Sequence, residues 1–441
     1  MAKAKVAVIG GGLAGVETAN RLAKEGFKVD LYEMRPKRQT PAHKTDKLAE
    51  LVCSNSLGGK EITTGSGLLK AEMEKLGSLV LEAAKLSEVP AGGALAVDRN
   101  LFSQYITAKL EENPNINLIR DEVKKLPLED YEVVVVASGP LTSDSLAQDI
   151  KEKLGEEYLF FYDAIAPIVD AESVDFSKGW WGSRYNKGGN DYFNCPLTEE
   201  EYERFIEELL KAQKVKPKEF EKACYFEGCM PIEVMAERGK DTLRFGPMKP
   251  VGLIDPKTGK EPYAVVQLRK ENKEGTLLSL VGFQTKLTYP EQKRVFRLIP
   301  CLRNAKFVRL GSVHRNTFLQ SNKLLKPTLQ SRKYPNLLFA GQITGVEGYV
   351  ASASTGIVAG ITAGRLLMGE EPLVFPKETM IGALLDYITS KEGELQPMNP
   401  VFGLLPPLER RVKNRKLRKE LLAKRALKTL EDFVEKYRLK V

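Results

Sequence analysis

Histidine and tryptophan are scarce in this chain of 441 residues, which has two of each. With only His43 and His314, neither in a ligand-like spacing, we expect no metal site and no serine–histidine triad. No apolar run reaches the roughly 18 residues that cross a bilayer, and the first apolar stretch, Val6 to Ile9, is too short for a signal-peptide core. These absences lead us to expect a soluble, cytoplasmic protein with no membrane association.

Cysteine is also sparse, and its five positions are scattered: Cys53, Cys195, Cys224, Cys229 and Cys301. An odd, dispersed set without an export signal predicts free thiols rather than a disulfide framework. Each thiol can be a small buried hydrophobe or a reactive group, and the sequence leaves both readings open. The C-x4-C spacing of flavin disulfide reductases occurs too, but roughly two hundred residues after the N-terminal glycine motif, so we discount it.

Glycine is abundant where the chain begins. Lys5 to Ile9 predicts a buried strand, Ala14 to Lys24 a helix, and Lys28 to Glu33 a second strand, which together form a parallel crossover unit. The turn between the first two is Gly10-Gly11-Gly12-Leu13-Ala14-Gly15 and fits G-x-G-x-x-G, which lets backbone approach a pyrophosphate at a helix N-terminus. Glu33, 18 residues after Gly15, is placed to accept hydrogen bonds from a ribose. The unit predicts a dinucleotide site, and does not itself choose between NAD and FAD.

A late segment, Phe339 to Tyr349, favours FAD over NAD. Its glycines follow a predicted strand, Leu337 to Ala340, and precede a helix, so a second glycine entry suits the far end of a longer cofactor. No second G-x-G-x-x-G is present for a separate nicotinamide domain, and any NADH or NADPH would bind transiently. We therefore expect FAD, with an ordinary helix-start loop as the alternative. The predicted cofactor residues are Gly10, Gly11, Gly12, Leu13, Ala14, Gly15, Glu33, Gly341, Gln342, Glu347 and Gly348.

The order of patterns predicts an α/β protein with a doubly wound parallel sheet that an α+β domain interrupts. Leu68 to Leu86 predicts a helix, Asp98 the N-cap of another, and Val133 to Val136 a strand covered on both faces. Aromatics and prolines dominate from about residue 158. We expect a Rossmann-like FAD-binding domain in two parts, 1–157 and 302–441, around an insertion at 158–301. Gly356, Gly360 and Gly364 predict a small-residue helix face that packs close to the sheet.

Positive charge is concentrated at the C-terminal end. From Glu409 to Val441, thirteen Lys or Arg stand against five Asp or Glu, a net of +8 out of the chain's +9. Apolar residues there recur at helical steps and predict an amphipathic helix with a basic face: Leu417, Leu421, Ala423, Leu427, Leu430, Val434 and Tyr437. Such a face is either simply solvated or binds a polyanion.

Five segments in order carry a resemblance: the glycine turn, Val52-Cys53-Ser54-Asn55-Ser56-Leu57-Gly58-Gly59, Phe226-Glu227-Gly228-Cys229-Met230-Pro231-Ile232-Glu233, Arg244-Phe245-Gly246-Pro247-Met248-Lys249-Pro250-Val251-Gly252-Leu253, and His314-Arg315-Asn316-Thr317-Phe318. From the first strand to about Leu367, the chain resembles the TrmFO family of folate- and FAD-dependent tRNA (uracil-5-)-methyltransferases.

The resemblance implies that methylenetetrahydrofolate donates a one-carbon unit to reduced flavin, which passes it to carbon 5 of the T-loop uridine at position 54, with NADH or NADPH as reductant. Carbon 5 of uracil becomes nucleophilic when a thiolate adds at carbon 6, and a second group must move the carbon-5 proton. Cys229 is then the candidate nucleophile and Cys53 the acid/base thiol beside the flavin, with exchanged roles as the alternative. Predicted phosphate or folate contacts are Arg244, Lys249, Lys286, His314 and Arg315.

The partners implied are the T-arm of tRNA and folate, with no obligate protein partner. Trp180, Trp181, Tyr185 and Tyr192 are candidates to stack on an extruded base, with core packing as the alternative. Three other functions remain open: the related carboxymethylaminomethyl tRNA-modifying flavoprotein, an NAD(P)H-dependent flavin oxidoreductase of a small molecule, and a non-catalytic flavin-binding RNA protein.

Overall fold

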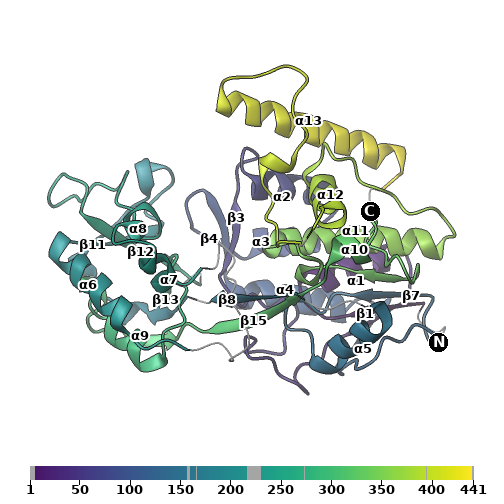
Figure 1. Ribbon diagram of the computed structural model, residues 1–441, viewed down its shortest axis with the longest axis horizontal. Helices are drawn as coiled ribbons and strands as arrows, with labels where there is room; N and C mark the ends of the chain where they lie inside the picture. Colours follow the sequence, from purple (N-terminus) through teal and green to yellow (C-terminus); the bar gives the residue numbers. More distant parts are fainter. Residues whose placement is uncertain are drawn as a thin grey trace.

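The computed structural model describes residues 5–155, 159–164, 166–215, 230–272, 274–393 and 395–439, with the backbone alone at 159–164 and 314–316. Figure 1 shows two lobes joined by a long strand pair, with the C-terminal helix lying across the top of the larger lobe. The larger lobe contains the two ends of the described chain, and the smaller one its middle. This arrangement matches a domain that is interrupted and then completed late in the sequence.

A five-stranded parallel sheet forms the centre of the larger lobe, in the order β16-β7-β1-β2-β6. Its strands are β1 (Val6–Ile9), β2 (Val29–Tyr32), β6 (Ile116–Ile119), β7 (Val133–Val136) and β16 (Leu337–Phe339). Strands β1, β7 and β16 are buried throughout, as an uninterrupted apolar run requires in a parallel sheet covered on both faces. The predicted Rossmann-like fold class is confirmed.

Helices α1 (Leu13–Lys24) and α11 (Tyr349–Leu367) pack tightly against each other. A Cβ on Gly356 would lie 2.2 Å from the Ala14 carbonyl oxygen, and one on Gly360 would lie 2.9 Å from Arg21 Cβ. The predicted small-residue face therefore exists, but it meets α1 rather than the sheet. Helix α11 is also long and apolar enough to cross a membrane by composition, yet 83% of its most apolar window is buried inside the protein.

The helix predicted over Leu68 to Leu86 is wrong as a single element. The structure has α2 (Gly65–Lys75) and α3 (Leu79–Leu86), separated at Gly77, whose φ is +75°. Ser78 then caps α3 through a hydrogen bond from the Leu81 N–H. The apolar spacing continues across Gly77, so the pattern alone does not reveal the break. The prediction that Asp98 is the N-cap of the next helix, α4 (Arg99–Glu111), is confirmed.

Three further elements complete this lobe. A three-stranded sheet, β3-β5-β4, comprises Ser56–Gly59, Ala94–Val97 and Glu88–Val89. Helix α5 (Asp144–Leu154) follows β7, and short α10 (Ser321–Leu324) precedes α12 (Met380–Ser390). The basic C-terminal helix is α13 (Arg415–Lys436), drawn in yellow in Figure 1. It docks through Leu422, Ala423, Ala426, Leu430 and Val434, with Leu427 and Tyr437 partly buried beside them. Five of the seven residues of the predicted apolar stripe therefore pack against the core, whereas Leu417 is 46% exposed.

The smaller lobe is α+β. Its sheet has the order β10-β11-β12-β13-β9-β14, from Trp180–Trp181, Tyr192–Leu197, Ala264–Lys270, Leu277–Leu280, Ile168–Asp170 and Phe307–Arg309. Helices α6 (Glu199–Lys211), α7 (Ile232–Glu237), α8 (Thr242–Phe245) and α9 (Tyr289–Phe296) accompany it. One apolar cluster, built from residues between Val169 and Phe307, forms its core.

The lobes are joined by β8 (Leu159–Ala164) and β15 (Val313–Phe318), which pair antiparallel. In Figure 1 this pair runs between the two lobes. The main core cluster of the larger lobe draws on residues up to Ala137 and again from Phe318 onward. The insertion at 158–301 stays a prediction.

Candidate cofactor and substrate site

The glycine turn between β1 and α1 forms a backbone cradle. A Cβ on Gly10 would lie 2.3 Å from the Ala137 carbonyl oxygen, and one on Gly15 only 1.8 Å from the Gly10 carbonyl oxygen. Gly12 differs, because nothing lies within 4 Å of the position of its Cβ. Gly12 is also the N-cap of α1 and offers no side-chain hydrogen bond, so the first N–H groups of the helix are available to an anion. Gly10 and Gly15 thus allow close packing, and Gly12 leaves open space.

A cavity with about 1050 Å³ of open space lies along this cradle. It is lined by Gly10 through Ala14 and by Glu33, while Gly341, Gln342, Tyr349 and Ser352 line it from the late segment. Gly341 and Gly348 each begin a helical segment with φ of +87° and +97°, as the predicted second glycine entry requires. Glu347 and Gly348 do not line the cavity, but Gln342 Nε2 donates to Glu347 Oε2 at 2.9 Å.

One end of the cavity is built around a buried ion-pair network. Glu33 accepts hydrogen bonds from the Gly11 N–H at 3.1 Å and from Arg35, whose backbone and side chain bind both carboxylate oxygens. Burial alone would raise the pKa of Glu33, but the hydrogen bonds and charge of Arg35 outweigh it and hold that pKa below its usual range. The carboxylate is therefore ionised and fully engaged, so a ribose hydroxyl would have to share or replace one of these bonds.

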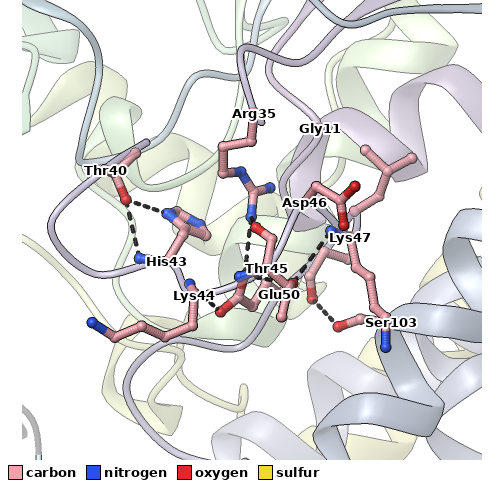
Figure 2. Close-up of polar contacts among 12 residues, drawn as sticks. Gly11, Arg35, Thr40, His43, Lys44, Thr45, Asp46, Lys47, Glu50 and Ser103 are labelled. Carbon is pink, nitrogen blue, oxygen red and sulfur yellow. Dashed lines mark hydrogen bonds and ion pairs between the residues drawn. The ribbon is translucent and has the colours of Figure 1, made fainter. Parts of the chain in front are cut away.

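Figure 2 shows the loop from Thr40 to Glu50 and the polar contacts that join it to Arg35. Arg35 Nη1 donates to Glu50 Oε2 and to the Thr45 carbonyl oxygen, each at 3.0 Å. Glu50 also accepts from the backbone N–H groups of Lys44 and Thr45. Arg35 thus ties the end of β2 to the loop, and Glu50, Thr40 and His43 line the cavity beside Glu33.

Cys53 lines a second cavity. Val52 lines the first cavity and Cys53 lines the other, so adjacent residues face both spaces. The N–H groups of Cys53 and Ser54 donate to Tyr349 Oη at 2.7 and 3.1 Å. Burial, with the charge of Cys53, raises the pKa of Tyr349 well above its usual value, so its phenol stays protonated. Cys53 is half-buried, unlike Cys195 and Cys301, which lie in the core of the smaller lobe.

The second cavity, which we call the arginine pocket, is defined by Cys53, Ser54, Arg99, Ala166, Arg269, Glu271, Ser279, Leu280, Val281, Gly282 and Gln284. Arg99 Nε forms an ion pair with Glu271 Oε2 at 2.8 Å, which joins the two lobes. Arg309 donates to the Val52 carbonyl oxygen at 2.6 Å. Burial and the like charge of Arg99 lower the pKa of Arg309. Both guanidiniums interact electrostatically with Cys53.

Several predicted substrate residues are not part of these cavities. Arg244 lies 3.7 Å over the ring of Tyr263 and donates to the carbonyl oxygen of that residue. Neither Lys249 nor Lys286 lines either cavity. The side chains of His314 and Arg315, and all of Cys229, lie outside the described residues. Their predicted contacts with phosphate, folate or uracil stay predictions.

The candidate stacking aromatics have structural partners. Trp181 packs at ring-centroid distances of 5.4 Å from Phe193 and 5.8 Å from Phe176, within the aromatic edge of the smaller lobe. The Tyr192 hydroxyl donates to the Ala91 carbonyl oxygen and so links the lobes. Core packing, the alternative considered for this set, therefore describes Trp181, whereas Tyr185 is 61% exposed.

The ionic residues that shape the site belong to no predicted motif: Arg35, Glu50, Arg99, Arg269, Glu271 and Arg309. Two had local signals, since Arg35 follows Glu33 by two residues and Arg99 follows the N-cap Asp98. The others come from separate strands and loops, and only the fold brings them to Cys53. Tyr349 ends the late glycine segment in the sequence, and no local pattern predicted that its hydroxyl would bind the backbone of Cys53 and Ser54.

Comparisons with known proteins agree with this geometry. Residues 5–371 match the family model described as glucose inhibited division protein A. The chain is 74% identical over 437 residues to the methylenetetrahydrofolate--tRNA-(uracil-5-)-methyltransferase TrmFO of Aquifex aeolicus, covering 99% of this chain and 98% of the relative. It is 65% identical over 434 residues to the protein of the same name from Persephonella marina, covering 98% and 99%.

A solved structure, Aquifex aeolicus GidA in the form I crystal, has the same fold, with a TM-score of 0.72 at 20% identity over 99% of this chain and 78% of that one. That likeness supports the architecture alone. Near-complete coverage at high identity distinguishes the TrmFO relatives from this more distant one, and the resemblance read from the motifs is confirmed. The chain belongs to the TrmFO family, within the broader family described by the glucose inhibited division protein A model.

Proposed function

We propose that this protein methylates carbon 5 of a uracil in tRNA, with methylenetetrahydrofolate as the carbon donor and FAD in the cavity along the glycine turn. The names of its full-length relatives state this reaction for them. The single observation that carries the proposal for this chain is the position of Cys53, which lines the arginine pocket next in the chain to Val52 of the glycine-lined cavity. The loop that carries this thiol therefore borders both the cofactor cavity and a second cavity that could take a substrate.

The first cavity fits FAD on physical grounds. Gly12 leaves room for a pyrophosphate at the uncapped start of α1, and the cavity extends from Glu33 to Tyr349. When bound, FAD supplies the redox chemistry that a one-carbon transfer from methylenetetrahydrofolate requires. The predicted cofactor residues that line the cavity would hold it: Gly10, Gly11, Gly12, Leu13, Ala14, Glu33, Gly341 and Gln342.

The chain's own residues would position and protonate the reacting groups. Tyr349 Oη fixes the backbone of Cys53 and keeps its own proton, so it can donate toward the first cavity, which it lines. Arg99 and Arg309 place positive charge near the Cys53 sulfur. A thiol among guanidiniums can hold or deliver a proton, or add to carbon 6 of uracil. We assign Cys53 the acid/base role and Cys229 the nucleophilic one, and exchanged roles are the alternative.

The finer parts of the proposal concern the substrate and reductant. The target is the T-loop uridine at position 54, and NADH or NADPH is the reductant. The T-arm of tRNA meets the exposed cations of α13 and of the segment just before it: Arg411, Lys413, Arg415, Lys416, Arg418 and Lys424. The reaction takes place in the cytoplasm without an obligate protein partner.

The test is transfer of a labelled one-carbon unit from methylenetetrahydrofolate to an unmodified tRNA transcript, with FAD and NADPH present. Wild type should label the transcript at position 54 only, and a transcript with cytidine there should stay unlabelled. No transfer under these conditions would defeat the proposal, and would favour a small-molecule flavin oxidoreductase or a non-catalytic RNA-binding flavoprotein.

Cysteine replacements test the assigned roles. Cys53→Ala should lower transfer by a factor of about 100 or more, as expected for loss of an acid/base group. The control is Cys301→Ala, a thiol buried in the smaller lobe, which should retain transfer within a factor of about three. Capture of a 5-fluorouridine tRNA should persist in Cys53→Ala and disappear in Cys229→Ala. Capture by both variants would exclude a covalent step through either thiol.

A further inference from the structure

Two buried polar atoms in the arginine pocket have no partner among the described residues. They are Arg269 Nε and Glu271 Oε1, on side chains that are 8% and 4% exposed. Both side chains line the pocket that also contains Cys53. An unpaired donor and an unpaired acceptor in a buried position both cost stability, so their retention side by side points to a ligand that supplies the missing bonds.

The local structure explains why the two side chains line the same pocket. Arg269 lies in β12 and Glu271 directly follows that strand, so their side chains leave the same face at alternate positions. Lys270 leaves the opposite face and lies 5.4 Å over the ring of Trp181. Strand β12 is a central strand of its sheet, which fixes this orientation.

Two other polar atoms of the pair are engaged across the lobes. Arg269 Nη2 donates to Asn55 Oδ1 at 2.8 Å, and Glu271 Oε2 pairs with Arg99 Nε at 2.8 Å. Asn55 in turn donates to the carbonyl oxygens of Val97 and Lys270. These contacts hold both side chains between the two lobes, while Arg269 Nε and Glu271 Oε1 stay without a partner among the described residues.

We propose that Arg269 and Glu271 read the imide edge of the target uracil, with Glu271 Oε1 accepting the ring N–H and Arg269 Nε donating to an adjacent ring carbonyl. This inference rests on the proposed function and names the subsite that holds the base beside Cys53. A cyclic amide edge, an N–H next to a C=O, is the chemistry that matches one free acceptor next to one free donor.

The pterin ring of folate also has a ring N–H next to a carbonyl, but the free atoms of Arg269 and Glu271 match uracil better than pterin. A pterin presents its ring N–H together with a neighbouring amino group, and so pairs best with both oxygens of a carboxylate. One oxygen of Glu271 is committed to Arg99, which leaves a single acceptor. Uracil presents a single N–H between two carbonyls, which a single acceptor matches.

The test uses Glu271→Gln in the FAD-loaded enzyme, with Glu274→Gln, an exposed position in the same connection, as the matched control. Binding is measured by fluorescence anisotropy with T-arm hairpins carrying uridine or cytidine at the target position. Cytosine lacks the ring N–H and one carbonyl of this edge. Wild type and the control should prefer the uridine hairpin by about tenfold or more, and Glu271→Gln should reduce that preference to about twofold.

Steady-state kinetics distinguish the two sources of the edge. Glu271→Gln should lower kcat/KM for tRNA by a factor of about 10 to 100 and leave the KM for methylenetetrahydrofolate within about twofold. Arg269→Lys keeps the charge but removes Nε, and should behave in the same direction. A raised folate KM with unchanged uridine preference would overturn the assignment in favour of the pterin.

Unchanged uridine preference and unchanged kinetics in both variants would overturn the inference entirely. Visible flavin spectra and melting temperatures close to those of wild type establish that the variants fold. Failure of the proposed function is separate, because wild type itself would then show no folate-dependent transfer to tRNA.

Discussion

Replacing Gly12 with alanine should separate cofactor binding from folding. Gly12 has a φ of −78°, which alanine adopts readily, and no protein atom lies within 4 Å of the position of a Cβ there. The substitution therefore removes entropy from the unfolded chain without strain in the folded one. We expect the free energy of unfolding of the apoprotein to be unchanged, or raised by up to about 1 kcal/mol.

The same methyl group would occupy space that the cofactor needs. Gly12 lines the cavity at the start of α1, where a pyrophosphate must approach the backbone. Forcing one extra methyl into a filled site costs about 1–3 kcal/mol. Since about 1.4 kcal/mol corresponds to a tenfold change in affinity, FAD should bind about 5 to 150 times more weakly.

The assay is calorimetric or fluorescence titration of apoprotein with FAD, beside urea unfolding of the same apoprotein. Gly93→Ala is the control, because Gly93 is exposed and also has open space at its Cβ position. Gly15→Ala gives the contrasting result, since its Cβ would lie 1.8 Å from the Gly10 carbonyl oxygen and should destabilise the fold itself. If Gly12→Ala bound FAD as tightly as wild type, the pyrophosphate would not lie at the start of α1. If the variant apoprotein lost much stability, the space around Gly12 would not be open as described.

Three further outcomes follow from the structure. Burial raises the pKa of Glu72 to about 8 although the N–H groups of Met380 and Ile381 donate to it. Its folded pKa lies above its unfolded value of 4.5, so stability falls as pH rises toward and through about 8. Urea unfolding of Glu72→Gln should show a smaller fall between pH 6 and 9, and an equal fall would contradict this. Tyr349→Phe leaves the N–H groups of Cys53 and Ser54 without their acceptor, and should lower stability by about 1–3 kcal/mol and one-carbon transfer by about tenfold, while FAD titration stays within about threefold. Unchanged transfer would remove Tyr349 from the positioning of Cys53. Replacing three exposed cations of α13, Arg415, Lys416 and Arg418, by Gln should weaken tRNA binding and reduce the slope of log affinity against log salt by up to about 3, whereas Lys109, Lys211 and Lys377 replaced together should not. If the two triple variants had equal salt slopes, the basic face of α13 would simply be solvated and would not contact tRNA.

The basic C-terminal segment is part of the packed core as well as a charged surface, so its role in tRNA binding is best tested by point substitutions rather than by truncation. Its charge and helical period are properties of sequence, and both predicted α13. Which apolar residues dock was decided by the neighbours: Lys75 of α2 pairs with Glu431, and Arg425 donates to carbonyl oxygens of the preceding loop. Because Leu422, Leu430 and Val434 are buried, deleting the tail would also expose the core.

The helix break at Gly77 and the packing of the glycine face of α11 against α1 both depend on tertiary contacts. Local spacing predicts that a helix has an apolar or small face, but not what lies against it. Glu17 of α1 accepts hydrogen bonds from Ser78 and from the N–H groups of Leu79 and Val80, which makes the start of α3 a tertiary feature. Gly356 is small because the backbone of Ala14 lies against it, more than three hundred residues earlier in the chain.

Sequence by itself determined the crossover unit, the glycine turn and the family, because each depends on residues that are close in the chain. Backbone conformation and side-chain period act over a few residues, so local patterns encode them. Tertiary structure alone decided that Arg99, Arg269 and Glu271 share a pocket with Cys53 and that Arg309 bonds to the neighbouring Val52. It also left two of their buried atoms without a partner in the described part of the chain. Burial and charge pairing act through space, and no local pattern carries that information.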